Sequence, residues 1–122
     1  MNKAVEFLRN KTFYLATIRG GAPVMRPFGA VMGFENKLYF VTSKNKQVYK
    51  QIIENPNVCI CACGENRQWV RINGVARADE RKSAKQKMLD TNPVLIERKR
   101  FTNADDKTLV VFCVDDCTVE FN

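Results

Sequence analysis

Residues 37–58 have the sequence KLYFVTSKNKQVYKQIIENPNV, and this stretch carries the clearest signal for how the chain folds. Its first part, Lys37–Thr42, is rich in aromatic and β-branched side chains, which favour a strand. Val48, Ile52 and Ile53 are then spaced as one apolar face of a helix. The Asn-Pro pair that follows ends that helix. The stretch therefore predicts a strand, a turn and a short helix, in that order.

The start of the predicted helix has the character of an anion site. Thr42 and Ser43 are suitable N-cap residues, and the first turn of a helix has unpaired N–H groups and a dipole that favours an anion. Lys44, Lys46 and Lys50 add positive charge there, so the site is suited to a phosphate. The same residues also fit an ordinary capped helix with a solvated basic face, and this stretch alone leaves both interpretations open.

The size and composition indicate one globular domain over residues 1–122. The chain has a mass of 14.0 kDa and a hydrophobic content of 45%, typical of a folded protein. No apolar run approaches the roughly 20 residues of a membrane span. The N-terminal sequence MNKAVEFLRNK has no apolar signal-peptide core. We therefore expect a cytoplasmic protein that does not bind a membrane.

The residue types narrow the possible chemistry. The chain contains no histidine, which excludes Ser-His-Asp and Cys-His nucleophiles and His-ligated zinc. Among the five cysteines, Cys59, Cys61 and Cys63 alternate along one predicted strand and point to one face. There is no C-x-x-C pair, so we expect buried or half-buried reduced thiols and no metal site. Redox chemistry would then belong to a bound cofactor.

A formal net charge of +7 indicates an anionic partner. The positive residues are spread along the chain without a block of like charge. A phosphorylated small molecule fits this pattern. A basic barrel that binds nucleic acid is an alternative, but the aromatic residues that would stack on bases are better placed in the core, so we expect no nucleic-acid partner.

Short strands joined by tight turns make up most of the chain. Besides the strand described above, we expect strands over residues 13–18, 23–34, 57–63, 68–78, 108–114 and 118–121. Pro27 and Gly29 interrupt the second of these, which indicates a bulge or an edge at Arg26–Gly29. We expect Asp115-Asp116 to turn the last two strands into a hairpin, and Gly74 to mark a bulge. Further helices are expected over 4–9 and 80–89, the second capped by Asp79, with one or two helical turns within 93–99. This order of elements indicates an antiparallel barrel.

Three motifs carry a resemblance to a known family: FYLATIRGGAPVMRPFG, LYFVTSKNKQVYKQIIENPNV and WVRINGVARAD. In this order they cover nearly the whole chain, which resembles the pyridoxamine 5′-phosphate oxidase-like FMN-binding split-barrel family. It is most similar to the short members related to nitroimidazole-resistance reductases. The resemblance implies a mainly β, six-stranded antiparallel Greek-key split barrel with a few short helices. It also implies a homodimer with one FMN in each of two clefts between the subunits.

The resemblance implies a phosphate site made of five residues. Arg26 matches the arginine that the family places near the FMN phosphate. Thr42 and Ser43 match the pair that ends the third strand beside the cofactor. Lys46 and Lys50 match the basic start of the following helix, which supports the phosphate.

The resemblance also implies residues beside the flavin ring. Pro27, Phe28 and Gly29 would lie along it. Trp69 falls where the larger oxidases have a glutamine that touches the flavin, and Arg71 shares its face of the strand. Phe28 and Trp69 are also the side chains that a flat apolar ring requires on physical grounds.

Two departures from the larger oxidases bear on the substrate. Val31 stands where they carry a lysine, and Lys46-Gln47-Val48 replaces their Ser-Arg-Lys run. The chain also ends at Asn122, without the segment that grips pyridoxal phosphate in those enzymes. We therefore expect FMN binding but not oxidation of pyridoxamine phosphate.

The preferred hypothesis is that the protein is an FMN-dependent oxidoreductase, which reduces a small organic substrate with electrons from NADH, NADPH or another donor. Tyr14, Tyr39, Tyr49 and Cys113 are candidate proton donors, and the sequence selects none of them as catalytic. The alternative is a non-catalytic split-barrel module that holds flavin or haem.

Overall fold

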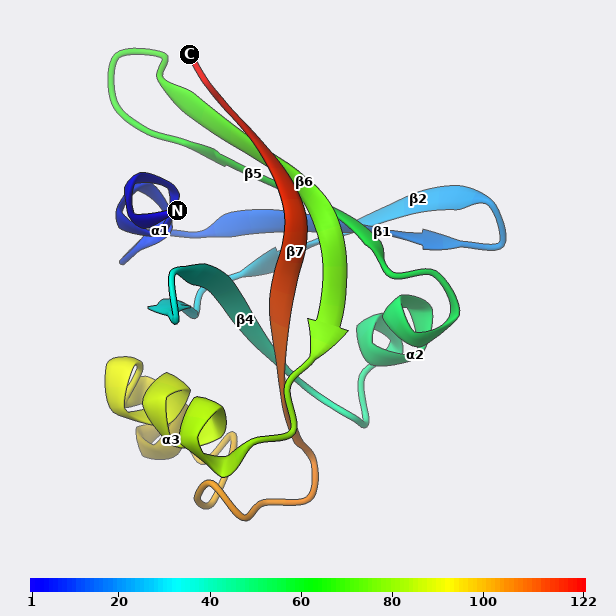
Figure 1. The fold of residues 1–122 in the computed structure, drawn as a ribbon, viewed down its shortest axis with the longest axis vertical. Coiled ribbons are helices and arrows are strands. Elements are labelled where there is room, and N and C mark those ends of the chain that lie inside the picture. Colours follow the sequence, from blue (N-terminus) through cyan, green and yellow to red (C-terminus); the bar gives the residue numbers. More distant parts are fainter.

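The computed structural model describes all residues, 1–122, and shows one strongly twisted antiparallel sheet with four short helices at its sides (Figure 1). Its strands, in chain order, are β1 (Phe13–Arg19), β2 (Ala22–Phe28), β3 (Val31–Phe34), β4 (Lys37–Ser43), β5 (Asn57–Cys63), β6 (Trp69–Ala78) and β7 (Leu109–Phe121). The helices are α1 (Asn2–Leu8), α2 (Gln47–Glu54), α3 (Lys82–Thr91) and α4 (Val94–Glu97). The strand order in the sheet is β2-β1-β5-β6-β7-β4-β3. The mainly β, antiparallel prediction is thus confirmed, but the sheet has seven strands and not six.

The segment over residues 23–34, expected as one strand interrupted at Pro27 and Gly29 with a bulge or an edge there, forms two separate edge strands at opposite ends of the sheet order. β2 pairs only with β1, and β3 pairs only with β4. The break falls at Gly29 and Ala30, two residues after Pro27. Proline has no N–H to donate to a ladder and is tolerated on an edge strand such as β2. The chain then crosses from one edge of the sheet to the other.

The hairpin expected at Asp115-Asp116 is wrong, because β7 runs through this point as one long strand. Asp116 and Cys117 lie together opposite Gly74 of β6, so the two residues form a β-bulge in β7. The positive φ of Asp116, 53°, fits such a local kink. The bulge expected at Gly74 is confirmed, although the extra residue belongs to the facing strand.

Two hydrophobic clusters pack against the sheet. The larger lies inside the curved sheet and contains Phe40 and Phe112, whose rings stack with centroids 5.4 Å apart. The smaller contains Tyr39 and Val41 and is covered by Met88 of α3. Alternate residues of β4 therefore enter different clusters, which explains why this strand is apolar on both faces.

Helix α2 starts later than expected, and two of its three expected apolar residues are buried. Lys46 is its N-cap residue and makes no side-chain cap bond. Thr42 and Ser43 do not cap it, because both belong to the end of β4. Ile53, expected in the core, is 59% exposed, whereas the polar Gln51 is only 5% exposed.

The remaining helices shift by a few residues from their predicted bounds. α3 begins at Lys82 with Arg81 as its N-cap residue, so the expected cap at Asp79 is wrong. The Asp79 carboxylate instead accepts a hydrogen bond from the Arg81 backbone N–H at 3.1 Å. No helix of the structure has both the length and the apolar character needed to cross a lipid bilayer.

We expect Gly74→Ala to destabilise the protein by about 1–3 kcal/mol. A Cβ at this position would lie 2.5 Å from Val114 Cγ1 and 2.7 Å from the Asp115 carbonyl oxygen, and the second is backbone that cannot rotate away. The midpoint of urea denaturation measures the effect. Gly33→Ala is the control, because its Cβ would come no closer than 3.7 Å to Val5. Equal stability of the two variants would contradict the prediction.

Candidate functional site

Arg26 of β2 lies at the centre of the candidate site and reaches from the sheet to α2. Its Nη1 donates to the Leu15 carbonyl oxygen at 3.1 Å and to Thr17 Oγ1 at 2.9 Å. Its Nη2 donates to Gln51 Oε1 at 2.7 Å. The Thr17 hydroxyl also donates to Gln51 Oε1, at 2.6 Å. These bonds connect the guanidinium to β1 and α2 at the same time.

The Arg26 guanidinium has no carboxylate partner. It takes part in none of the ion pairs of the chain, and all three acceptors that it contacts are neutral oxygens. Burial, with a smaller effect from the charge of Arg19, lowers the pKa of Arg26 below its ordinary value. Partly burying a cation without a counter-ion costs free energy. The position is therefore suited to a bound anion.

Two exposed lysines add positive charge to the same helix. Lys46 is the N-cap residue of α2, and Lys50 directly precedes the buried Gln51. They are four residues apart and so lie on one side of the helix. Neither forms an ion pair within the chain. The contact of Arg26 with α2 thus brings three cations without carboxylate partners to this helix.

The hydroxyl groups of Thr42 and Ser43 do not contact Arg26. Thr42 is buried at the end of β4, and Ser43 is half-buried. Ser43 Oγ accepts a hydrogen bond from the backbone N–H of Asn45 at 3.2 Å, which shapes the turn into α2. Their expected role beside the cofactor stays a prediction.

Sequence reasoning missed Thr17 and Gln51, the two side chains that hold Arg26. Thr17 lies two residues after Leu15, on the same inner face of β1, and is buried. Gln51 lies next to Ile52 on the buried side of α2. A polar residue beside the apolar positions of a helix is the signal that could have identified Gln51.

The three residues expected along the flavin ring point in different directions. The Phe28 ring lies 6.0 Å from that of Phe13 and 5.8 Å from that of Phe40, so core packing fixes it. Pro27 is exposed and lies on the other face of β2. Gly29 is exposed, and a Cβ there would meet no atom within 4 Å. Open space therefore exists beside Gly29.

Trp69 and Arg71 lie at the start of β6, on the opposite face of the sheet from Arg26. The Arg71 guanidinium lies over the Trp69 ring at 5.1 Å and bonds to Glu120 at 3.1 and 3.2 Å. β6 is three strands away from β2. Arg26 pairs with the buried Leu15, whereas Arg71 pairs with Cys61 on the outer face. One chain by itself therefore does not bring Trp69 and Arg71 to the cationic site.

The outer face of β2, β1 and β5 carries an apolar strip. Tyr14 pairs with Cys61, and Ala16 pairs with both Met25 and Cys59. Tyr14 is 46% exposed and Met25 is 65% exposed. An uncovered strip of this kind beside Trp69 is typical of a surface that another molecule covers.

The cysteines are free thiols. Cys59, Cys61 and Cys63 share the outer face of β5, as their spacing predicted. Cys63 is exposed, so the expectation of buried or half-buried thiols is wrong for this residue. Burial raises the pKa of Cys59 and Cys113 above the ordinary value of a thiol.

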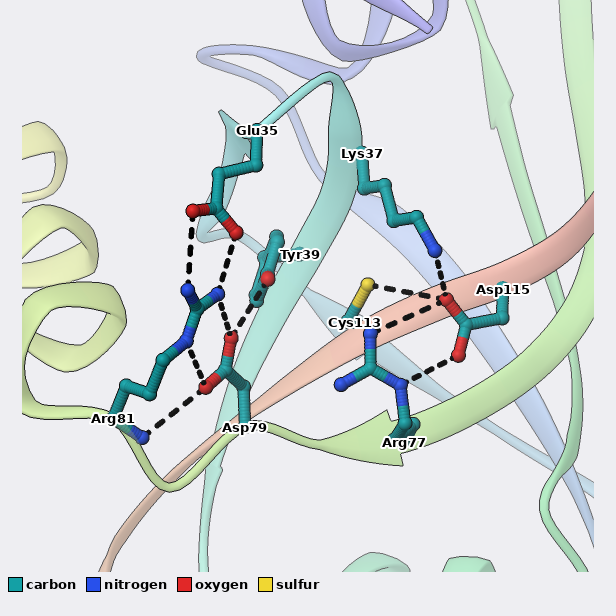
Figure 2. Close-up of polar contacts among 8 residues, drawn as sticks. All are labelled: Glu35, Lys37, Tyr39, Arg77, Asp79, Arg81, Cys113 and Asp115. Atoms are coloured by element: carbon teal, nitrogen blue, oxygen red, sulfur yellow. Dashed lines mark hydrogen bonds and ion pairs between the residues drawn. The ribbon is translucent and has the colours of Figure 1, made fainter.

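One polar network joins β4 to the start of α3 (Figure 2). Arg81 Nη2 bonds to Asp79 Oδ2 at 2.8 Å and to Glu35 Oε1 at 2.6 Å, and the Tyr39 hydroxyl donates to Asp79 Oδ2 at 2.8 Å. Asp79 is 5% exposed. The bond from Arg81, aided by that from Tyr39, holds the pKa of Asp79 well below its usual range. The hydroxyl group of Tyr39, one of the candidate proton donors, is therefore engaged in a hydrogen bond within the fold.

A second network joins three strands. Asp115 of β7 accepts hydrogen bonds from Lys37 of β4 at 2.5 Å and from Arg77 of β6 at 2.7 Å (Figure 2). The Cys113 thiol lies 3.5 Å from the same carboxylate. The bonds from Arg77 and then Lys37 hold the pKa of Asp115 well below its usual range. Asp115 therefore links β4, β6 and β7 beside the bulge.

Comparisons with known proteins agree on one family. A family model described as pyridoxamine 5′-phosphate oxidase matches residues 1–116. A NimC/NimA family protein from Clostridium acetobutylicum is 37% identical, with a TM-score of 0.90 over 99% of this chain and 83% of that chain. No curated protein sequence matches this chain.

Two more distant structures share the fold alone. The haem storage protein HutZ from Vibrio cholerae is 16% identical, with a TM-score of 0.73 over 98% of this chain and 92% of that chain. An F420 reductase is 20% identical, with a TM-score of 0.67 over 97% of this chain and 94% of that chain.

We expect Asp79→Asn to lower stability at pH 7 by about 1.5–3 kcal/mol, because charge-assisted hydrogen bonds from Arg81 and Tyr39 are lost. The pKa of Asp79 is lower in the folded state than in the unfolded state, where it is about 3.9. The stability that its charge provides is therefore complete above about pH 5 and is lost as the pH falls toward the folded pKa.

Urea denaturation at pH 7 and at several acidic pH values measures this difference. The gap between wild type and variant should shrink with acid. The matched control is Asp105→Asn, which removes an exposed ion pair with Lys82 and should change stability by less than about 1 kcal/mol. A gap of the same size at every pH would contradict the assignment.

Proposed function

The chain belongs to the pyridoxamine 5′-phosphate oxidase family, and we propose that it binds FMN and reduces a small organic substrate. The family and the split-barrel fold expected from the sequence motifs are confirmed. The observation that carries the proposal is the Arg26 guanidinium, which is held by three neutral acceptors and has no counter-ion. A phosphate monoester is an anion that this group is suited to bind.

The proposal assigns the phosphate to the residues around α2. Arg26 has five N–H groups and uses three hydrogen bonds within the chain, so at least two N–H groups remain for a ligand. Lys46 and Lys50 are free to add charge from the solvent side of α2, and Thr42 and Ser43 precede it. A single phosphate site without a G-x-G-x-x-G motif favours FMN over a dinucleotide such as FAD.

When bound, FMN supplies the hydride chemistry through its flavin ring, with NADH or NADPH as the proposed electron source. The chain positions the cofactor and excludes water from it. Gly29 leaves open space beside the ring, and Phe28 is fixed by the core. No side chain of the site is placed as an acid or base, and the substrate would be bound between the ring and the second subunit.

We further propose that the cofactor site is completed by a homodimer. Trp69 and Arg71 lie on the outer face of the sheet, continuous with the exposed strip around Tyr14 and Met25. This face would form a wall for a flavin ring that is held mainly by the other subunit. Aromatic residues and arginine are enriched in such interfaces.

A non-catalytic module that holds flavin or haem is the alternative. The similarity to HutZ in fold gives the haem version its specific support. Since the chain has no histidine, haem would require Cys, Met or Tyr as its axial ligand. The visible absorption spectrum separates the two cofactors, because flavin absorbs in the blue region and haem has a Soret band.

We expect the apoprotein to bind FMN more tightly than FAD or riboflavin. We also expect Arg26→Ala and Lys46→Ala to weaken FMN binding by about 10- to 100-fold, because a charge-assisted hydrogen bond to phosphate contributes about 1.5–3 kcal/mol. Fluorescence titration measures the affinities, and thermal unfolding checks the fold. Lys87→Ala, an exposed lysine on α3, is the matched control. Tighter binding of FAD, or wild-type FMN affinity in both variants, would rule out this phosphate site.

We expect sedimentation at micromolar concentration to give about twice the chain mass of 14.0 kDa. The interface should bury more than roughly 1,200 Å² in total. Met25→Glu should weaken the dimer and FMN binding together, whereas Ile96→Glu, on α4, should change neither. A stable monomer that binds FMN tightly would argue against both the dimer and the shared site.

A further inference from the structure

The side-chain amide of Gln51 has a fixed orientation, which follows from its neighbours. The Arg26 guanidinium can only donate hydrogen bonds, and it lies 2.7 Å from the Gln51 side chain. The Gln51 atom that faces Arg26 must therefore be the oxygen. The same oxygen accepts from the Thr17 hydroxyl at 2.6 Å.

The amide nitrogen of Gln51 is consequently left without an acceptor. Gln51 is 95% buried, since its exposed fraction is 5%, yet the side chain takes part in hydrogen bonds only through its oxygen. No fully buried side-chain nitrogen or oxygen of the protein lacks a partner. The nitrogen must therefore keep a small opening to solvent, next to the guanidinium that its own oxygen holds.

Gln51 has two free N–H groups, and Arg26 beside it has further free N–H groups. Together they form a cluster of hydrogen-bond donors without an acceptor. Water can satisfy such donors only in part when the side chain is this buried. An anion with several oxygens satisfies them together. Glutamine is also neutral, so it holds Arg26 without cancelling the charge that attracts the anion.

We propose that Gln51 has two roles in the phosphate site: its oxygen positions Arg26, and its amide nitrogen donates a hydrogen bond to the bound phosphate. This inference rests on the proposed function for the identity of the ligand, FMN. The anion contact itself follows from the donors of this chain. Gln51 would thus select ligands that carry a phosphate over those that do not.

The test is the variant Gln51→Glu, which has nearly the same shape. Its carboxylate keeps the acceptor for Arg26 and forms an ion pair with it, so the unfolding temperature should stay equal or rise. It removes the amide donors and adds negative charge at the anion position. We expect the affinity for FMN to fall about 10- to 100-fold and the affinity for riboflavin, which lacks the phosphate, to stay unchanged. Gln86→Glu, on the exposed side of α3, makes the same charge change and should alter neither affinity.

A second measurement uses inorganic phosphate as the probe. Phosphate added to the wild-type protein should shift the NMR signal of the Gln51 side-chain amide, and Gln51→Glu should abolish phosphate binding. If the variant keeps its FMN affinity, or loses FMN and riboflavin affinity equally, the role of Gln51 is overturned while FMN binding by the wild type stands.

The two proposals can fail separately. A wild-type protein that binds no FMN but shows the phosphate-induced shift at Gln51 supports the anion contact and overturns the flavin proposal. A protein that shows neither FMN binding nor the shift overturns both.

Discussion

The pairing of β7 with both β4 and β6 is the constraint on which the rest of the structure depends. β7 is the one strand that connects β3 and β4 to the other four strands of the sheet. Its first half, Leu109–Val114, pairs with β4, and residues 112–121 pair with β6, with the bulge opposite Gly74 in the part that pairs with β6. Asp115, bonded to Lys37 and Arg77, joins the same three strands through side chains. Because β7 holds β4 in the sheet, helix α2, which follows β4 in the chain, packs beside β1.

A cation held by neutral oxygens is the main chemical feature that this arrangement creates. Burying Arg26 beside a carboxylate would cost less free energy, but the carboxylate would also neutralise its charge. Thr17 and Gln51 fix the guanidinium without removing its charge. The donors are thus already ordered within the chain, a state that lowers the entropy cost of binding in general. Because Arg26 is hydrogen-bonded to Gln51 of α2, the position of the guanidinium also depends on how that helix packs.

The fold by itself does not decide what this protein binds. The haem storage protein and the F420 reductase share it at low identity, and their names give different ligands. Side chains, and not the fold, must therefore distinguish one ligand from another. In this chain the side chains around α2 provide cationic donors without carboxylate partners, and the chain has no histidine. This combination favours a phosphorylated cofactor and distinguishes the site from one built around an imidazole–iron bond.

The sequence by itself determined the family, the antiparallel sheet and the strand leading to α2, because short-range periodicity and motif order carry that information. Three features depended on the tertiary structure. The hairpin expected at Asp115-Asp116 is a bulge instead, since β7 pairs with β6 both before and after this point. Ile53 is exposed and Gln51 is buried, because the Gln51 side chain accepts hydrogen bonds from Arg26 and Thr17 of the sheet. The separation of Trp69 from Arg26 reflects which face of the sheet each residue occupies, a property of register and strand order that no local pattern encodes.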